Sequence, residues 1–202
     1  MIFYFHGYSS SEKSHKAAVI KKYFSGYQVC IPGYPSHQPR QSIMQLTATI
    51  NEYTGLDKGR SVMLIGSSLG GFYAQYLAAQ LPCVSSLVLI NPCLEPKKTL
   101  AGQLGQQTNM VSGAVFEFTG EDLEGFESYQ IAEQDLFSPA LVLLDEGDEI
   151  IDYRVAAERY REKGDIVIAP ANVPHKFINT GEGILRQVDI HPASKMVQFN
   201  LE

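Results

Sequence analysis

The chain has 202 residues, of which 45% are hydrophobic and 19% are charged. These values fit one α/β domain and exclude a disordered chain, and no apolar run approaches the roughly 20 residues that a membrane span needs. Sixteen basic residues stand against 22 acidic ones, so the net charge of −6 argues against nucleic acid or anionic lipid as a partner.

Cysteine usage and the first residues bear on the compartment. Cys30, Cys83 and Cys93 show no C-x-x-C spacing and leave one cysteine over, so we expect reduced thiols rather than a disulfide framework or a zinc site. Met1 leads straight into apolar residues, without the basic start and cleavage site of a signal peptide. We therefore expect a cytoplasmic protein.

Short, almost wholly apolar runs alternate with segments of helical spacing. In chain order, the expected elements are a strand at 2–5, a helix at 13–24, a strand at 27–31, a helix at 42–53, a strand at 61–65, a helix at 69–81, strands at 86–90 and 140–144, a helix at 153–163, a strand at 165–169 and part of a helix at 183–188. Apolar strands in alternation with helices indicate a parallel sheet covered on both faces. We predict a three-layer α/β fold over residues 1–202, with a mostly parallel sheet of about six strands and helices on both faces.

The middle of the chain, residues 92–139, is the irregular part. It is rich in Gly, Gln and Glu, and it carries a short strand pattern at 115–119. Two interpretations stay open: a long connection with one or two helices, or a mobile cap over a site. An apolar pocket lined from this segment would favour medium or long acyl chains, and a shallow one would favour short chains.

A G-x-S-x-G motif at residues 66–70 carries the chemistry. It follows an apolar strand and opens a helix, which is the strand–turn–helix setting of a nucleophile elbow. Gly66 and Gly70 leave room in the tight turn, and Ser68, the middle serine, is the candidate nucleophile. Ser67 is expected to pack or to hydrogen-bond locally.

A serine hydroxyl needs a base and an acid that orients the base. The acid should follow a later strand, and Asp148 is favoured over Asp145 and Asp152 because Gly147 permits a turn before it and an apolar residue can anchor the loop after it. The base should follow the last strand. His175 is favoured there over His191, which lies beyond the last expected helix.

The turn after the first strand should present a donor to an oxyanion. Gly7 lets the chain bend close to a substrate, and we predict the backbone N–H groups of Tyr8 and Leu69 as the oxyanion donors. His6, at a strand end, is expected to have a structural hydrogen-bonding role. Cys93 is expected to be a buried thiol rather than a nucleophile.

Nucleotide and metal motifs are absent from the sequence. It holds no G-x-G-x-x-G, no G-x-x-x-x-G-K-[ST] and no H-E-x-x-H, so we predict neither a cofactor nor a metal.

Several stretches together resemble the YqiA/YcfP-like esterases of the α/β-hydrolase superfamily. They are FHGYSSS at 5–11 with Lys13, Lys16 and Ala17 after it, GSSLGGFYA at 66–74, LINP at 89–92, GDEIIDY at 147–153 and HKF at 175–177. The resemblance implies a compact α/β-hydrolase fold without the first two strands of larger members. It also implies cytosolic ester or thioester hydrolysis by a triad of Ser68, Asp148 and His175. The chain departs from many hydrolases at 172–174, where Asn-Val-Pro stands in place of a glycine before the histidine.

The sequence therefore predicts a serine hydrolase that cleaves a small-molecule carboxylic ester, or a thioester, through an acyl-enzyme on Ser68. Thioesterase, lipase and peptidase activities are rivals within the same superfamily. An acyl-CoA substrate would need Lys97, Lys98 or Arg40 near the pocket to offset the negative net charge. The alternative from another class is a catalytically silent hydrolase fold that binds a small ligand or a partner protein.

Overall fold

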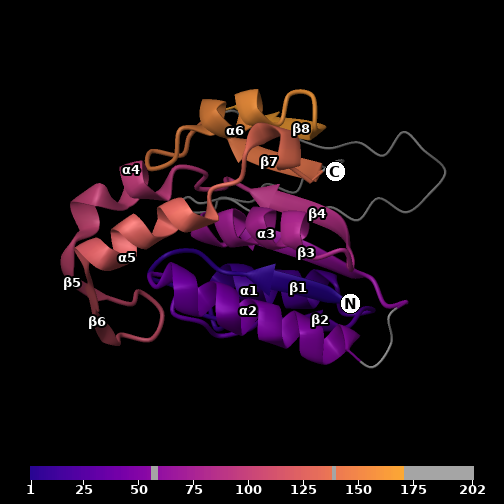
Figure 1. The fold of residues 1–202 in the computed structure, drawn as a ribbon, viewed down its shortest axis with the longest axis horizontal. Helices are drawn as coiled ribbons and strands as arrows, with labels where there is room; N and C mark the ends of the chain where they lie inside the picture. Colours follow the sequence, from indigo (N-terminus) through magenta and orange to yellow (C-terminus); the bar gives the residue numbers. More distant parts are fainter. Residues whose placement is uncertain (56–58, 138–139, 171–202) are drawn as a thin grey trace, which may run out of the picture.

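A computed structural model describes residues 1–55, 59–137 and 140–170. Six parallel strands form one sheet in the order β2-β1-β3-β4-β7-β8 (Figure 1). These strands are β1 (Ile2–Phe5), β2 (Val29–Cys30), β3 (Val62–Ser67), β4 (Val84–Ile90), β7 (Ala140–Asp145) and β8 (Gly164–Ala169). The predicted α/β fold with a parallel sheet of about six strands is confirmed. The strand expected at 27–31 is shorter than predicted, because only two of its residues pair with β1.

The helices lie in the order expected between the strands. They are α1 (His15–Tyr23), α2 (Pro39–Thr54), α3 (Leu69–Gln80), α4 (Pro96–Leu100), α5 (Gly120–Gly125) and α6 (Tyr153–Arg159), with 3-10 turns η1 (Ala101–Gln103), η2 (Phe126–Tyr129) and η3 (Glu133–Asp135). In the described part of the chain, none combines the length and the apolar character that crossing a membrane requires.

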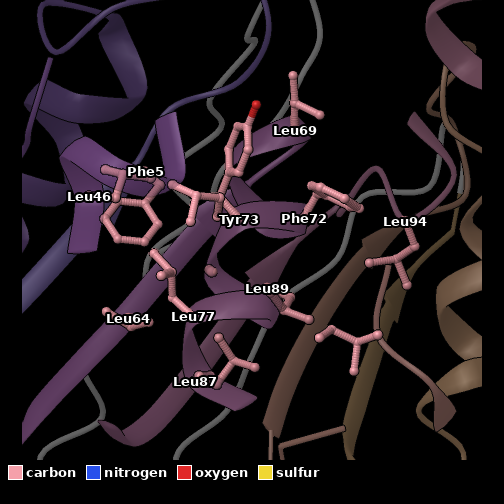
Figure 2. Packing of buried hydrophobic residues seen from close by; sticks show 14 of the residues in the cluster. Phe5, Leu46, Leu64, Leu69, Phe72, Tyr73, Leu77, Leu87, Leu89 and Leu94 are labelled. Atoms are coloured by element: carbon pink, nitrogen blue, oxygen red, sulfur yellow. The ribbon is translucent and has the colours of Figure 1, made fainter. Parts of the chain in front are cut away.

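Two hydrophobic clusters cover the two faces of the sheet. The larger one joins Phe3 and Phe5 of β1 to α2, α3 and α6, and Figure 2 shows Leu46 of α2 and Tyr73 of α3 packed beside Phe5. The smaller one joins Ile2 and Tyr4, which point to the opposite face, to α1. The period-2 alternation of β1 thus supplies both clusters.

Residues 92–139 fold against the main core. Their two strands, β5 (Gly105–Thr108) and β6 (Val115–Phe118), pair as an antiparallel hairpin outside the sheet. The strand pattern noted at 115–119 corresponds to β6. Phe118, Leu123 and Phe126 of this region are buried in the larger cluster, so the region shares the core of the sheet.

Candidate active site

Ser68 stands at the turn between β3 and α3 in a strained backbone conformation. Its φ of 54° and ψ of −125° lie in a region that residues with a side chain seldom occupy, at a cost of about 1–3 kcal/mol. Three backbone hydrogen bonds hold the residue: its N–H donates to Ile90 O at 3.0 Å, and its carbonyl accepts from Gly71 at 2.8 Å and Cys93 at 3.0 Å. A non-glycine residue kept in such a conformation is typical of a functional position.

The glycines beside Ser68 are required by close backbone approach. A Cβ atom at Gly66 would collide with the carbonyl oxygen of Gly70, and one at Gly70 would collide with that of Phe5. A Cβ at Gly7 would lie 3.0 Å from the Ser68 Cβ and 3.4 Å from its Oγ. The loop after β1 therefore runs directly against the candidate nucleophile.

The two predicted oxyanion donors follow the two residues of this contact in the sequence. Leu69 is the first residue of α3, where backbone N–H groups lack acceptors within the helix, and Tyr8 follows Gly7. Within the described ranges, neither N–H donates to another group of the protein. The Tyr8 and Leu69 N–H groups therefore have no acceptor among the described residues, and their role as oxyanion donors stays a prediction.

His6 is buried beside Tyr34 rather than open to the site. Its ring stacks on the Tyr34 ring at 4.3 Å, and its carbonyl accepts a hydrogen bond of 2.5 Å from the Tyr34 hydroxyl. Burial is the main effect on the imidazole and lowers the pKa of His6, against smaller opposing effects of the Gly7 carbonyl and Glu12. A buried ring with a lowered pKa fits the expected structural role at the start of the Gly7 loop.

Asp148 lies in the loop after β7, where its carboxylate accepts three hydrogen bonds from groups of its own loop and of Asn91. One oxygen accepts the N–H groups of Ile150 and Ile151, each at 3.0 Å, and the other accepts the Asn91 side-chain N–H at 2.9 Å. Asn91 follows β4, is buried, and has a positive φ of 39°. Its side-chain oxygen also accepts the Asp145 N–H at 2.7 Å, so Asn91 joins the ends of β4 and β7.

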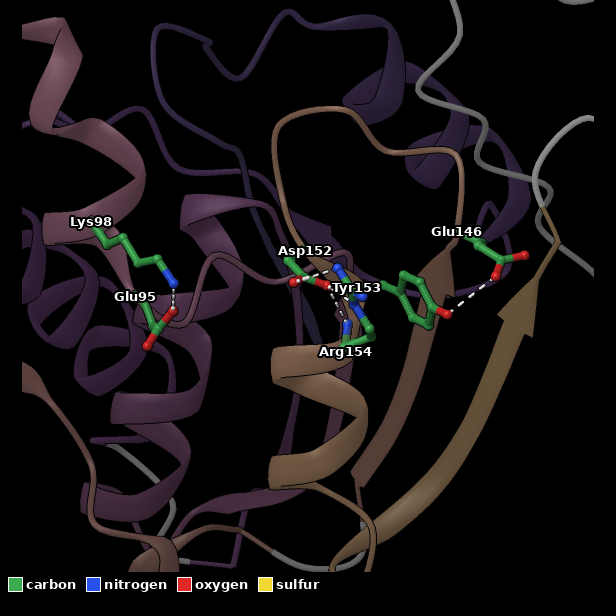
Figure 3. A network of polar contacts seen from close by, with 6 residues as sticks. All are labelled: Glu95, Lys98, Glu146, Asp152, Tyr153 and Arg154. Atoms are coloured by element: carbon green, nitrogen blue, oxygen red, sulfur yellow. Dashed lines mark hydrogen bonds and ion pairs between the residues drawn. The ribbon is translucent and has the colours of Figure 1, made fainter.

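The other two candidate acids serve local structure. The Asp145 carboxylate accepts the Gly147 N–H at 2.8 Å inside its own loop. Asp152 caps α6 and pairs with Arg154 at 2.8 Å, as Figure 3 shows, and hydrogen bonds from Arg154 are the main cause of its lowered pKa. These partners make Asp152 the least suited of the three to a catalytic role.

A cavity of about 320 Å³ opens beside Ser68. Its walls include the loop after β1, the first turn of α1 and the tip of the β5–β6 hairpin, which contributes Met110 and Val111. The hairpin is tied to the loop by three hydrogen bonds, of which that from the Met110 N–H to Ser9 O is 2.9 Å long. Part of residues 92–139 therefore forms one wall of the site.

Lys16 of α1 is a site residue that our sequence reasoning did not single out. It is half-buried, lines the cavity with Ser68, and its ammonium donates to the Ser67 hydroxyl at 3.4 Å. Burial lowers the pKa of Lys16, while the Asp148 and Asp145 carboxylates raise it to a lesser extent. Its position directly before the buried Ala17, and its place in the family-like stretch after residue 11, were the available signals.

The cations considered earlier for an anionic substrate lie elsewhere. Lys97 pairs with Glu124 at 2.8 Å and Glu127 at 3.1 Å, Lys98 pairs with Glu95 at 3.3 Å (Figure 3), and Arg40 lines a separate groove along α2. None of the three lines the cavity at Ser68.

The remaining questions from the sequence concern the Cys93 thiol, a metal site and the two histidines considered as the base. Cys93 is 2% exposed, and burial raises the pKa of its thiol to about 11, so the side chain is an inert thiol at neutral pH. Among the described residues, no group of three or more His, Cys, Asp or Glu could hold a metal ion. His175 and His191 lie outside the described residues.

A serine held in a strained strand–helix turn, at the carboxyl edge of a parallel sheet, defines the α/β-hydrolase class of fold. Solved structures agree with that class. The chain matches Est1E from Butyrivibrio proteoclasticus with a TM-score of 0.65 at 14% identity, covering 84% of this chain and 77% of that one. It matches a Pyrococcus furiosus esterase with a TM-score of 0.63 at 16% identity, covering 84% and 73%.

The chain belongs to UPF0227, described as an uncharacterised protein family, whose model matches residues 1–191. A UPF0227 protein of Serratia proteamaculans is 24% identical over 186 residues, which cover 92% of this chain and 96% of the relative. One from Vibrio parahaemolyticus is 23% identical over 177 residues, covering 88% and 91%. The resemblance to YqiA/YcfP-like α/β-hydrolases is thereby confirmed.

Proposed function

We propose that this protein is a serine hydrolase that cleaves carboxylic esters, or thioesters, of small molecules in the cytoplasm. The strained conformation of Ser68, with the Gly7 loop packed against its side chain, carries the proposal. Strain of this kind persists only where the surrounding structure enforces it, and here it raises a hydroxyl at the rim of a cavity.

In the proposed reaction, His175 accepts the Ser68 proton as the hydroxyl attacks the acyl carbonyl carbon. The carbonyl oxygen becomes an oxyanion, which the N–H groups of Tyr8 and Leu69 stabilise. Asp148 orients the imidazolium without taking its proton. His175 then protonates the leaving alkoxide or thiolate, and water, activated in the same way, hydrolyses the acyl-enzyme.

The size of the cavity favours small esters. At about 320 Å³ it is near the lower end of the range of ligand pockets, about 300–1,000 Å³. Five of its twelve lining residues are serines, and its apolar side chains include Met110, which is 89% exposed. These features support a short acyl chain over a long one.

A fluorophosphonate probe tests the proposal, with the modified peptide identified by mass spectrometry and a panel of esters, thioesters and amides assayed in parallel. We expect labelling at Ser68 that disappears in Ser68→Ala. No labelling of a folded sample would refute the proposal and favour a silent, ligand-binding protein. Amide hydrolysis at rates comparable to ester hydrolysis would refute the esterase assignment.

Matched variants test the other two members of the triad. Asp148→Asn should lower kcat by about 10³-fold or more. Asp152→Asn keeps a capping oxygen for α6 but removes the charge that pairs with Arg154, and it should keep its activity. His175→Gln is compared with His191→Gln in the same way. A loss in Asp145→Asn that exceeds the loss in Asp148→Asn would reassign the acid.

A further inference from the structure

The charge on the cavity wall is uneven. Among the described residues that line it, Lys16 carries the only ammonium or guanidinium group, and none is Asp or Glu. A protein with a net charge of −6 thus presents a cation, with no carboxylate on the same wall, beside the candidate nucleophile.

The Lys16 ammonium is not held in an ion pair by the described part of the chain. Its hydrogen bond there is to the neutral hydroxyl of Ser67, at 3.4 Å, which is long for such a contact. Asp148 and Asp145 act on it electrostatically, but no carboxylate of the described residues lies within 4.0 Å of its nitrogen. As far as the described residues go, the ammonium keeps hydrogen-bonding capacity for a ligand.

On the cavity wall, the groups that accompany the Lys16 ammonium include several neutral hydroxyls. Ser14 and Ser10 hydroxyls share its cavity wall, and burial raises the pKa of Tyr4 to about 12, so this phenol stays protonated. A cluster of hydroxyls and one ammonium, partly withdrawn from water, is the chemistry that binds carboxylate or phosphate oxygens. A bound anion would also replace the solvation that the half-buried ammonium lacks.

We propose that Lys16 determines substrate specificity by binding an anionic group, a carboxylate or a phosphate, on the ester that Ser68 attacks. This inference rests on the proposed function, since it names the class of ester that the same site takes. In this proposal the cation that binds an anionic substrate is Lys16, and not Lys97, Lys98 or Arg40.

The test compares isosteric esters that differ in charge. For the alcohol side, the probes are 4-acetoxybenzoate, 4-acetoxybenzamide and (4-acetoxyphenyl)trimethylammonium. For the acyl side, they are the 4-nitrophenyl monoester of adipic acid and 4-nitrophenyl hexanoate. The readout is the ratio of kcat/KM for the anionic ester to kcat/KM for its neutral partner.

Lys16→Met should lower that ratio by about tenfold or more on one of the two sides, because a hydrogen bond to a charged group contributes that much. The side on which it falls locates the anion. Lys16→Arg should restore most of the ratio, and Lys13→Met, which removes an exposed charge three residues earlier, should leave it as in the wild type.

Two results would overturn the assignment. Equal losses for anionic and neutral esters in folded Lys16→Met would give Lys16 a structural role and refute the specificity role alone. Failure of the wild type to hydrolyse any of the five esters, together with no fluorophosphonate labelling, would refute the proposed function itself.

Discussion

A methyl group at position 7 would press on the candidate nucleophile. The added Cβ would lie 3.0 Å from the Ser68 Cβ, whereas carbon atoms pack at about 3.5–4.0 Å. The two residues must therefore move apart by about half an ångström. The Ser68 backbone resists such a displacement, because its N–H and its carbonyl both form backbone hydrogen bonds. We expect Gly7→Ala to lower the free energy of unfolding by about 1–3 kcal/mol. Since a displacement of about 1 Å costs about 100-fold in rate, kcat/KM should fall about tenfold.

The assay is the rate of fluorophosphonate labelling at Ser68, with urea denaturation to confirm folding. Gly26→Ala is the matched control, because a Cβ at Gly26 meets no atom within 4 Å, and it should label at the wild-type rate. Folded Gly7→Ala that labels as fast as Gly26→Ala would show that the Gly7 loop does not constrain the reacting hydroxyl. The reasoning about the site would then be wrong.

Substitutions at Asn91, His6 and Lys16 probe the site and its surroundings. Asn91→Ala should lower the free energy of unfolding by about 2–4 kcal/mol in urea denaturation, because it removes hydrogen bonds to Asp148 and Asp145. Asn91→Gly should cost about 1 kcal/mol less at this positive φ, and an equal cost would contradict that. Burial lowers the pKa of His6, so just below pH 6.5 the unfolded chain binds more protons than the folded chain. The free energy of unfolding should therefore decrease in that range as the pH is lowered. The slope should shrink in His6→Gln but not in exposed His15→Gln. Burial also lowers the pKa of Lys16, so Lys16→Met should raise the urea midpoint at pH 7, by an amount that declines towards pH 10; a lowered midpoint would contradict this.

The sheet could be predicted because its signals are local. β1 matches the expected range of 2–5 in full, and α3 begins at Leu69 as expected, because an apolar run and a glycine-rich turn determine both without distant contacts. The candidate nucleophile follows from the same stretch of chain. The fold class then follows from the alternation of strands and helices.

The β5–β6 hairpin and the position of Lys16 at the cavity could not be predicted from local sequence in the same way. β5 is the polar sequence GQQT, and hydrogen bonds from Ser9 and Asn109 that span 99 residues hold the hairpin in place. Helical periodicity puts Lys16 at the edge of a buried stripe, but it cannot tell solvent from a cavity. That distinction depends on the loop after β1 and on the hairpin tip, both of which are set by tertiary contacts.

The order of strands in the sheet supports the proposed base between Ser68 and Asp148. Ser68 follows β3 and Asp148 follows β7, and β4 lies between these strands. Neighbouring strands are about 4.8 Å apart, so the two strand ends are separated by about 10 Å. That gap is too wide for a hydrogen bond between serine and aspartate, and it suits an imidazole placed between them. Asn91, at the end of β4, fixes Asp148 on the far side of the gap. β8 is the next strand beyond β7, so the chain leaves β8 on the Asp148 side of the sheet, and His175, the proposed base, follows β8 in the sequence.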